Sequence, residues 1–319
     1  MDPERKLTFT LVELLACRGV ASRAKCSTAF TLIELLVVIS ILLVVMGLLF
    51  PVLSKSKMKS KATICMSNER QIAQAFILYS NEYNGIMVAG RMPDNTAFDV
   101  GNGLKWRPRW YAQVGISGKF YAFSNPSPLK PDDNPQRVDN KAFLCPEKPV
   151  MDNGRNYCYG YNFQFLGNSR KKSSGAYISW PRKIDIIKNH SGTVMFADCM
   201  GTAAGKAKSS RLPYDDSLRF ASSANTFKIG NHAWALDPPK LVAGSSDYCD
   251  DASRAPEHRS AIYPVHLNRA NVAFLDGHVE SKSLEELGYQ VGEDGTIGLN
   301  GDNKFFSGTG ANDNPPDIN

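Results

Sequence analysis

Three side chains near the end of the sequence, His266, Asp276 and His278, belong to the types that bind metals or transfer protons. Imidazole nitrogens and carboxylate oxygens are common ligands of transition metals. Asp276 and Gly277, however, lie between two short β-prone runs, where an Asp-Gly pair takes the positive φ angles of a type I′ turn at low cost. We therefore predict that His266, Asp276 and Gly277 are structural and bind no metal. In this interpretation His266 hydrogen-bonds across the hairpin and fixes its register.

A second group of candidate ligands lies in the Gly-rich segment 292–306, which contains Asp294, Asn300 and Asp302. Side-chain oxygens at such density can hold calcium. Their spacing differs from that of an EF-hand loop, and a solvated, turn-rich segment explains the same composition. We expect no cofactor here, with calcium as the alternative. The last residues, 307–319, have a composition typical of disordered tails.

The longest apolar run, residues 30–50, contains a single charge, Glu34. The run is long enough to cross a bilayer as a helix. A lone carboxylate in such a helix costs roughly 2.5–3.5 kcal/mol or more, so Glu34 needs a partner. A secretory signal peptide has an apolar core of only about 7–15 residues that ends at a small-residue site. The length of the run and its glutamate therefore favour another kind of signal.

Residues 30–34, FTLIE, together with Pro51, resemble the N-terminal signal of type IV prepilins and type II secretion pseudopilins. The resemblance implies that a prepilin peptidase and methyltransferase cuts between Ala29 and Phe30 and methylates the new amine. It also implies that this amine pairs with Glu34 of a neighbouring subunit, and that Pro51 kinks the helix. One departure is Ala29, because the family usually has glycine before the cut. A near copy of the signal, FTLVELL at 9–15, is too short to span a membrane and indicates a leader of duplicated origin or a misassigned start.

A second signature lies near the other end of the chain. His266 is followed by nine residues and then by Asp276-Gly277, which is similar to the H-x9-DG pattern of prepilin-type proteins. The segment 65–85 also resembles the start of the head in large pseudopilin-like proteins. Together these resemblances cover roughly residues 26–85 and 260–282.

The resemblance implies an α+β, pilin-like fold: a long N-terminal transmembrane helix extends into a head with an antiparallel β-sheet and long loops. The expected parts are a leader at 1–29, a transmembrane and polymerisation helix at 30–51, an amphipathic helix at 52–85 and a head at 86–306. Residues 52–83 contain neither glycine nor proline, and Asn84-Gly85 should end the helix. A stripe at helical spacing should pack on the head; its residues are Ile72, Phe76, Tyr79 and Tyr83.

Within the head, aromatic residues alternate strictly over 157–165, which predicts a strand. Residues 193–197 predict another strand, and 272–280 a hairpin. The segment 86–142 is rich in Gly, Pro, Asn and Asp, and we expect little regular structure there. Its aromatics, Trp106, Trp110 and Tyr111, either cover the sheet or bind sugars or a partner, and the first interpretation is favoured.

Seven cysteines are present, and Cys17 and Cys26 lie in the expected leader. An oxidising exterior would favour one or two disulfides among the others, and their odd number leaves at least one thiol unpaired. These others are Cys65, Cys145, Cys158, Cys199 and Cys249. The sequence has no C-x-x-C pair, which argues against a zinc or thioredoxin-like site.

The leading hypothesis is a structural pseudopilin or prepilin-like subunit of a type II secretion or type IV pilus-like filament in the bacterial inner membrane, with its head outside. Its partners would be the peptidase, other pseudopilin subunits, an inner-membrane secretion platform and the lipid bilayer. The alternative is a membrane-anchored module that binds envelope components or polysaccharide. No catalytic motif of the G-x-S-x-G or H-E-x-x-H type is present, so we expect no enzyme. The net charge of +6 is dispersed, which argues against a nucleic-acid surface.

Overall fold

The computed structural model describes residues 31–92, 97–129, 136–148, 158–167, 169–171, 177–179, 181–218, 226–241 and 258–316. Outside these residues lie the expected leader with its FTLVELL copy and the expected cleavage site at Ala29 and Phe30. Tyr157, Cys249 and residues 317–319 lie outside them as well. The chain divides into two units, residues 1–52 and 53–319.

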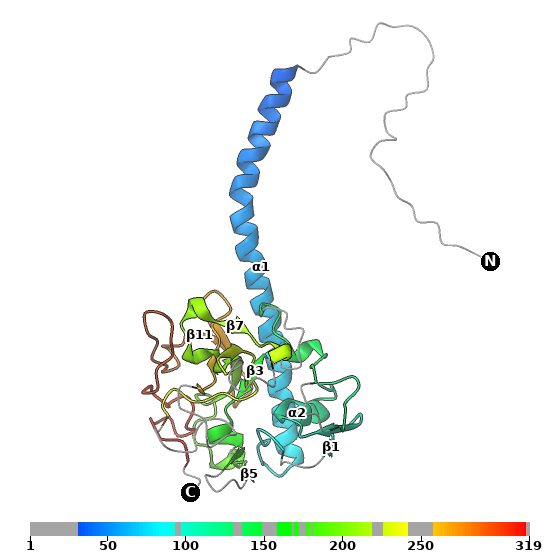
Figure 1. The fold of residues 1–319 in the computed structure, drawn as a ribbon, viewed down its shortest axis with the longest axis vertical. Coiled ribbons are helices and arrows are strands. Elements are labelled where there is room, and N and C mark those ends of the chain that lie inside the picture. Colours follow the sequence, from blue (N-terminus) through cyan, green and yellow to red (C-terminus); the bar gives the residue numbers. More distant parts are fainter. Residues whose placement is uncertain are drawn as a thin grey trace, which may run out of the picture. The chain divides into compact units, whose positions relative to one another are not determined.

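The helix α1 (Leu32–Glu82) has residues in both units (Figure 1). It continues through Pro51 and ends before Asn84 and Gly85, whose φ angles of 53° and 78° lie in the left-handed region. Glycine and asparagine adopt this region more readily than other residues, so they are common where helices end. The predicted helix and its predicted end are both confirmed.

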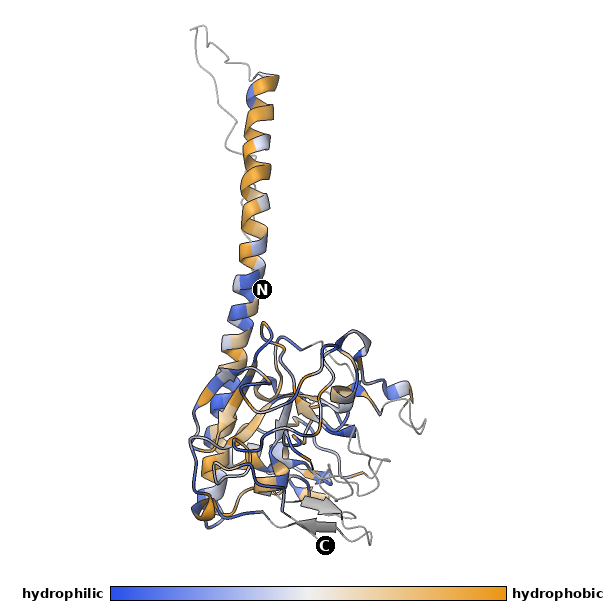
Figure 2. Ribbon diagram, turned by 90° about the vertical axis from the view of Figure 1, so that its left-hand side faces the viewer, coloured by the Kyte–Doolittle hydropathy of each residue, from blue (hydrophilic) through white to orange (hydrophobic). Residues whose placement is uncertain are grey.

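In the first unit, every described residue of α1 is exposed, and most of these side chains are apolar. Figure 2 shows apolar colours along this part of the helix. By length and composition, α1 is the one helix among the described residues that can cross a membrane. The exposed apolar surface fits a membrane-anchored protein, since exposed patches of this extent are rare on soluble monomers.

The second unit is built on an antiparallel sheet with strand order β11-β10-β6-β3, and β9 also pairs with β6. The central strand β6 is buried over its whole length, and its sequence is apolar except for Asp198. The predicted strand at 193–197 and the predicted hairpin at 272–280 are confirmed. The strands are β3 (Tyr159–Tyr161), β6 (Val194–Gly201), β9 (Ala261–Ile262), β10 (Ala270–Phe274) and β11 (Val279–Lys282).

The second half of α1 packs against this sheet through the predicted stripe. Ile72, Phe76 and Tyr79 are buried, and the Phe76 ring stacks on Phe196 of β6 with centroids 5.5 Å apart. Tyr83 is the exception, because it follows the end of the helix and remains 47% exposed while its ring stacks on that of Tyr79. The stripe therefore joins α1 to the middle of the sheet.

The segment 86–142 contains more regular structure than expected: a two-stranded ribbon, β1 (Ala97–Asp99) with β2 (Leu104–Trp106), and the helix α2 (Trp110–Gly118). Trp110 and Tyr111 are buried at the start of α2, where Trp110 contacts Phe76 and donates its indole N–H to the Trp234 carbonyl at 2.7 Å. Tertiary packing of these aromatics offsets the poor local propensity of the segment. The expectation that Trp110 and Tyr111 cover the core is confirmed, and Trp106 is half-buried.

The strand predicted at 157–165 is wrong beyond Tyr161. Residues 163–167 form one π-helical turn, in which Phe163, Phe165 and the residues between them are all buried. The Asn162 side chain donates to the carbonyls of Val194 and Phe306, and the Asn162 backbone carbonyl accepts from the Leu166 N–H. Alternation of aromatics indicated period two, whereas burial on all sides gives no such period.

The β10–β11 hairpin has a different turn from the one predicted. Gly277 has a φ of 91°, but Asp276 is not among the described residues with positive φ. The Gly277 N–H donates to the Phe274 carbonyl, and the Phe274 N–H donates to the His278 carbonyl, each at 2.9 Å. This is a three-residue loop with glycine at its left-handed position, which requires positive φ at one residue only.

The tail was expected to be disordered, but residues 307–316 are ordered on the second unit. Ser307 is buried, the Gly308 carbonyl accepts from the Lys188 N–H at 2.9 Å, and the buried Asn303 donates to the Asp313 carbonyl at 2.9 Å. These bonds satisfy polar groups that composition alone assigns to solvent.

The remaining elements are short. Two further ribbons are formed by β4 (Ser169–Lys171) with β5 (Tyr177–Ser179), antiparallel, and by β7 (Leu212–Pro213) with β8 (Lys228–Ile229), parallel. The 3₁₀ turns are η2 (Lys141–Phe143), η4 (Ile184–Ile186), η5 (Thr202–Gly205), η6 (Lys208–Ser210) and η7 (Asp216–Leu218), and the π-helical turn is η3 (Phe163–Gly167).

Candidate functional site

The start of α1 shows how Glu34 is held in the first unit. The Glu34 N–H donates to the Thr31 hydroxyl at 3.2 Å, while the Glu34 carboxylate accepts from the Thr31 N–H at 2.8 Å and from its hydroxyl at 2.7 Å. This reciprocal arrangement is a capping box, which satisfies two amide groups at the helix start. The carboxylate remains exposed and open to a further partner.

The H-x9-DG pattern divides into two separate places. Asp276 is exposed in the turn, where its carboxylate accepts from the His278 N–H at 3.1 Å and contacts the His278 ring at 2.5 Å. His266 is buried. Its backbone pairs with Arg269, and its ring is turned toward β6, so the side chain does not bridge the hairpin as predicted. Gly277 serves the turn.

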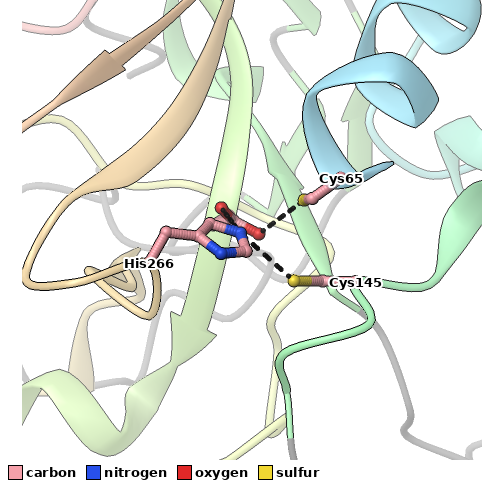
Figure 3. A group of neighbouring side chains, drawn as sticks. Cys65, Cys145 and His266 are labelled. Carbon is pink, nitrogen blue, oxygen red and sulfur yellow. Dashed lines mark hydrogen bonds and ion pairs between the residues drawn. The ribbon is translucent and has the colours of Figure 1, made fainter. Parts of the chain in front are cut away.

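The His266 ring lies in a buried cluster with Cys65, Cys145 and Asp198 (Figure 3). His266 Nε2 is 3.2 Å from Asp198 Oδ2 and 3.4 Å from Cys145 Sγ, and Cys65 Sγ is 3.5 Å from Asp198 Oδ1. One ligand atom from each residue lies within 4.8 Å of the other three. All four residues are buried, with at most 5% of their surface exposed.

Four elements far apart in sequence bring these side chains together. Cys65 is on α1, seven residues before the buried Ile72; Cys145 follows η2; Asp198 is in the middle of β6; and His266 precedes β10. The Asn68 side chain of α1 donates to the Lys141 and Leu144 carbonyls, at 3.2 and 3.3 Å, which ties the Cys145 segment to the helix.

Two further residues hold the cluster in place from the sheet side. The Asn271 N–H of β10 donates to Asp198 Oδ2 at 3.0 Å, and the Tyr159 hydroxyl of β3 is 3.3 Å from Cys65 Sγ. Neighbouring strands therefore orient both the carboxylate and one thiol. Such surrounding bonds are typical of sites whose geometry must be fixed.

Glu69 adds a second buried carboxyl group one helical turn after Cys65. It is fully buried, its Oε1 is 3.8 Å from Cys65 Sγ, and its Oε2 has no hydrogen-bond partner among the described residues. Burial, followed by the negative charge of Asp198, raises the pKa of Glu69 well above its usual range.

Burial also raises the pKa of the Cys65 thiol well above its usual value, whereas a hydrogen bond from Cys65 is the largest cause that lowers the pKa of Cys145 to about 7. For His266, burial acts to lower the pKa, but hydrogen bonds to Asp198 and Cys145 outweigh it and raise the pKa to about 10. The His266 ring thus interacts with both groups that face its Nε2, the Asp198 carboxylate and the Cys145 thiol.

The residue types in this cluster suggest a Cys-His-Asp catalytic triad, but the geometry does not match one. In a triad, the nucleophile and the carboxylate contact different nitrogens of the imidazole. Here Cys145 and Asp198 both face Nε2, and Nδ1 of His266 has no partner among the described residues. The side chains are also closed to a substrate. Donor atoms that converge on one point instead match a metal centre.

Sequence reasoning found His266 but missed Cys65, Cys145 and Asp198. No short spacing joins them, and this spacing is the signal by which metal motifs are recognised. A weaker signal was present: Asp198 interrupts a buried apolar strand, and Cys65 and Glu69 lie on the same helical face as Ile72. Charged groups inside apolar elements need compensation, and this requirement points to a site.

The residues of the calcium alternative, Asp294, Asn300 and Asp302, are not gathered around a common point by any interaction in the described residues. Asp294 accepts from the Thr296 N–H and hydroxyl, both at 2.8 Å, and Asp302 accepts from the Lys304 N–H at 3.0 Å. Asn300 pairs its backbone with Lys240. Local turn bonds thus occupy both carboxylates.

The predicted disulfides are not present among the described cysteines. The four that are described are buried free thiols, namely Cys65, Cys145, Cys158 and Cys199. The site cysteines therefore remain available as ligands.

Comparison with known families gives one match. A model described as the prokaryotic N-terminal methylation motif matches residues 25–50. The chain carries a prepilin-type signal. The matched residues extend into the long apolar helix α1, and the second unit contains antiparallel β-sheets, which is consistent with a pilin-like α+β fold. Comparisons with curated proteins and with solved structures found no match.

Proposed function

We propose that this chain is a structural subunit of a pilin-like filament, cut between Ala29 and Phe30 and methylated on the Phe30 amine. The observation that carries the proposal is the continuity of the methylation motif, at 25–50, with α1, whose residues up to 52 present apolar side chains to their surroundings. Such a surface can be covered by lipid before assembly and by neighbouring helices afterwards.

Glu34 supports the same proposal. Its exposed carboxylate already accepts bonds from Thr31, and carboxylate oxygens have further acceptor capacity. Cleavage before Phe30 would create a new ammonium group four residues before Glu34. Pairing of that ammonium group with Glu34 of a neighbouring subunit would neutralise two charges that are each costly in lipid.

The subunit would work mechanically in a type II secretion or type IV pilus-like system of the inner membrane, with prepilin peptidase, other subunits and an assembly platform as partners. We propose no enzymatic activity for it. The buried cluster supports this view, because its side chains are closed to substrates.

A membrane-anchored binding module is the second candidate. Trp110 and Tyr111, which could have formed a sugar platform, are buried in the core. An open cleft of about 960 Å³ favours the idea independently, since it offers charges of both signs beside an aromatic ring; its lining includes Lys208, Arg211, Tyr263, Glu293 and Asp294.

The proposal is tested by sequencing the N-terminus of the chain produced in a host with and without an active prepilin peptidase. We expect a mature chain that begins at N-methylated Phe30 only when the peptidase is active. Ala29→Gly should be cleaved at least as well, whereas Ala29→Arg should retain its leader. Recovery of the intact leader from the wild type beside an active peptidase, or of a terminus inside α1, contradicts the proposal.

A further inference from the structure

We propose that Cys65, Cys145, Asp198 and His266 form a structural zinc site that joins α1 to the sheet. The four residues come from four separate elements, and their ligand atoms lie within 4.8 Å of one another. Figure 3 shows the two cysteines and the histidine pointing toward one another. The inference concerns the second unit alone and does not depend on the function proposed for the first.

Three contacts within the cluster have about the length expected between the ligands of a tetrahedral zinc ion. Bonds of about 2.0–2.3 Å to nitrogen, oxygen and sulfur at tetrahedral angles place neighbouring ligand atoms about 3.3–3.8 Å apart. Three contacts within the cluster measure 3.2, 3.4 and 3.5 Å. These contacts link all four residues in a chain from Cys145 through His266 and Asp198 to Cys65.

The orientation of His266 supports a central ion. Its Nε2 faces both Asp198 and Cys145, as it must when all donors surround one point. Asp198 also uses its two oxygens for different neighbours, Oδ1 toward Cys65 and Oδ2 toward His266. No triad or simple hydrogen-bonded pair requires this convergence of four donors.

Charge and burial provide a second, independent argument. Glu69 is fully buried beside Cys65, and its Oε2 has no partner among the described residues. A buried carboxyl group with one oxygen that has no partner among the described residues, close to the buried carboxylate of Asp198, concentrates acceptor oxygens in the core. A divalent cation bound by the four neighbouring ligands would compensate negative charge at this place.

The donor set selects the metal. Calcium and magnesium require oxygen ligands, whereas two sulfurs, one nitrogen and one oxygen in a tetrahedral arrangement suit zinc. On binding, the ion would replace the thiol protons of Cys65 and Cys145 and the proton on His266 Nε2, all of which pass to water, and no group would change its oxidation state. Four protein ligands leave no open position, so the site would be structural.

This site would give His266 of the H-x9-DG pattern a role that the sequence did not predict. The ion would tie α1, the segment after η2, strand β6 and the turn before β10 to a single point. Loss of the ion should therefore loosen the attachment of α1 to the sheet.

The test measures metal in the full chain, purified in detergent without added chelator. We expect about one zinc ion per chain by elemental analysis. Cys145→Ser and His266→Gln should lose the zinc. Cys199→Ala, which changes the cysteine next to Asp198 on β6, and His278→Ala, which changes the exposed hairpin histidine, should retain it. Zinc content that is equal in all variants overturns the proposal.

A second measurement uses the wild type alone and so does not depend on the folding of variants. Co²⁺ added to the metal-stripped chain should produce the intense near-ultraviolet absorption of thiolate-to-cobalt charge transfer, and Zn²⁺ should abolish it. The absence of this absorption overturns the proposal. So does a metal-free purified chain in which peptide mapping finds a disulfide between Cys65 and Cys145.

Discussion

Glu34 and Glu69 stand on the same helix, α1, but the two units that share the helix treat their carboxylates in opposite ways. Glu34 is exposed among apolar residues and bonded to Thr31, while Glu69 is fully buried with one oxygen that has no partner among the described residues. A charge on an exposed apolar surface can be compensated by another molecule. A buried carboxylate must be compensated from within, by a proton, by hydrogen-bond donors or by a positive charge such as a bound cation.

Removal of the Glu34 carboxylate should therefore affect the association of subunits and not the fold of the single chain. Glu34→Ala should leave membrane insertion intact, because it removes a charge from lipid, yet it should weaken filament assembly by leaving the amine of Phe30 unpaired. An unpaired charge of this kind costs roughly 2.5–3.5 kcal/mol, which corresponds to a loss in subunit association on the order of a hundredfold. Fractionation and crosslinking would measure the two effects.

Ser40→Ala is the matched control for this experiment, because Ser40 is another polar residue in the same exposed part of α1, and its hydroxyl bonds only to the Val37 carbonyl one turn back. It should assemble normally. If Glu34→Ala assembles as well as the control, Glu34 has no pairing role, and its charge is not compensated by a neighbouring subunit.

A substitution at Phe76 should instead destabilise the second unit and leave the first unit unchanged. Phe76→Ala should lower the free energy of unfolding by about 3–5 kcal/mol, because the ring is buried against Phe196, Trp110 and Tyr161. Unfolding of the detergent-solubilised chain, followed by tryptophan fluorescence, would measure this loss. Membrane insertion should be unchanged.

Ile64→Ala provides the control, since Ile64 lies on the same helix but is 54% exposed, and its loss should change stability by no more than about 0.5 kcal/mol. Equal effects of the two substitutions would show that α1 does not attach to the sheet through the Phe76 face.

Local patterns in the sequence were sufficient for part of this architecture. The end of α1 at Asn84-Gly85 and the stripe from Ile72 to Tyr79 follow from residue spacing, as do strand β6 and the β10–β11 hairpin. The π-helical turn at 163–167 could not be predicted in this way, because burial on every side removes the period that distinguishes helix from strand.

The candidate site was less accessible for a related reason. His266 was recognised through its pattern with Asp276, yet in the structure His266 lies in the buried cluster beside Asp198, and Asp276 lies in the exposed turn beside His278. Cys65, Cys145 and Asp198 meet His266 only through tertiary packing. No local rule relates residues that lie so far apart along the chain, and only the buried polar residue in β6 gave a hint.

The turn of the β10–β11 hairpin lies close to α1 and offers a further test of packing in the second unit. Gly277 has a φ of 91°, and a Cβ placed on it would lie 3.1 Å from the Ile77 Cδ1 of α1. Gly277→Val should therefore destabilise the second unit by roughly 1–2 kcal/mol, through strain at positive φ and crowding against the helix. Gly292→Ala, at a glycine without positive φ, should cost less, and the same unfolding assay would compare them. Equal stability of wild type and Gly277→Val would contradict the turn geometry.

Lys105 tests whether burial in the second unit also disfavours the charged form of a basic side chain, as it does for the acidic Glu69. This residue of β2 is 4% exposed, its Nζ has no hydrogen-bond partner among the described residues, and the same atom lies 5.3 Å from the centre of the Phe123 ring. Burial, and then the charge of Arg109, lower the pKa of Lys105 to about 7. The unfolded chain, where a lysine has a pKa of about 10.4, therefore binds more protons than the folded chain between these two values. Stability contributed by this group must rise with pH from about 7 to about 10.4.

Lys105→Met should remove that rise and stabilise the protein by roughly 2–4 kcal/mol at pH 7 and below, where the native lysine must either lose its proton or carry a charge out of water. The measurement is the free energy of unfolding at several pH values, for this variant and for Lys141→Met, a change at an exposed lysine that should track the wild type. A curve for Lys105→Met that runs parallel to the wild type across this range would mean that the lysine keeps its charge in the folded protein. Burial would then disfavour charged side chains only near the cluster around Cys65 and His266, and not at Lys105.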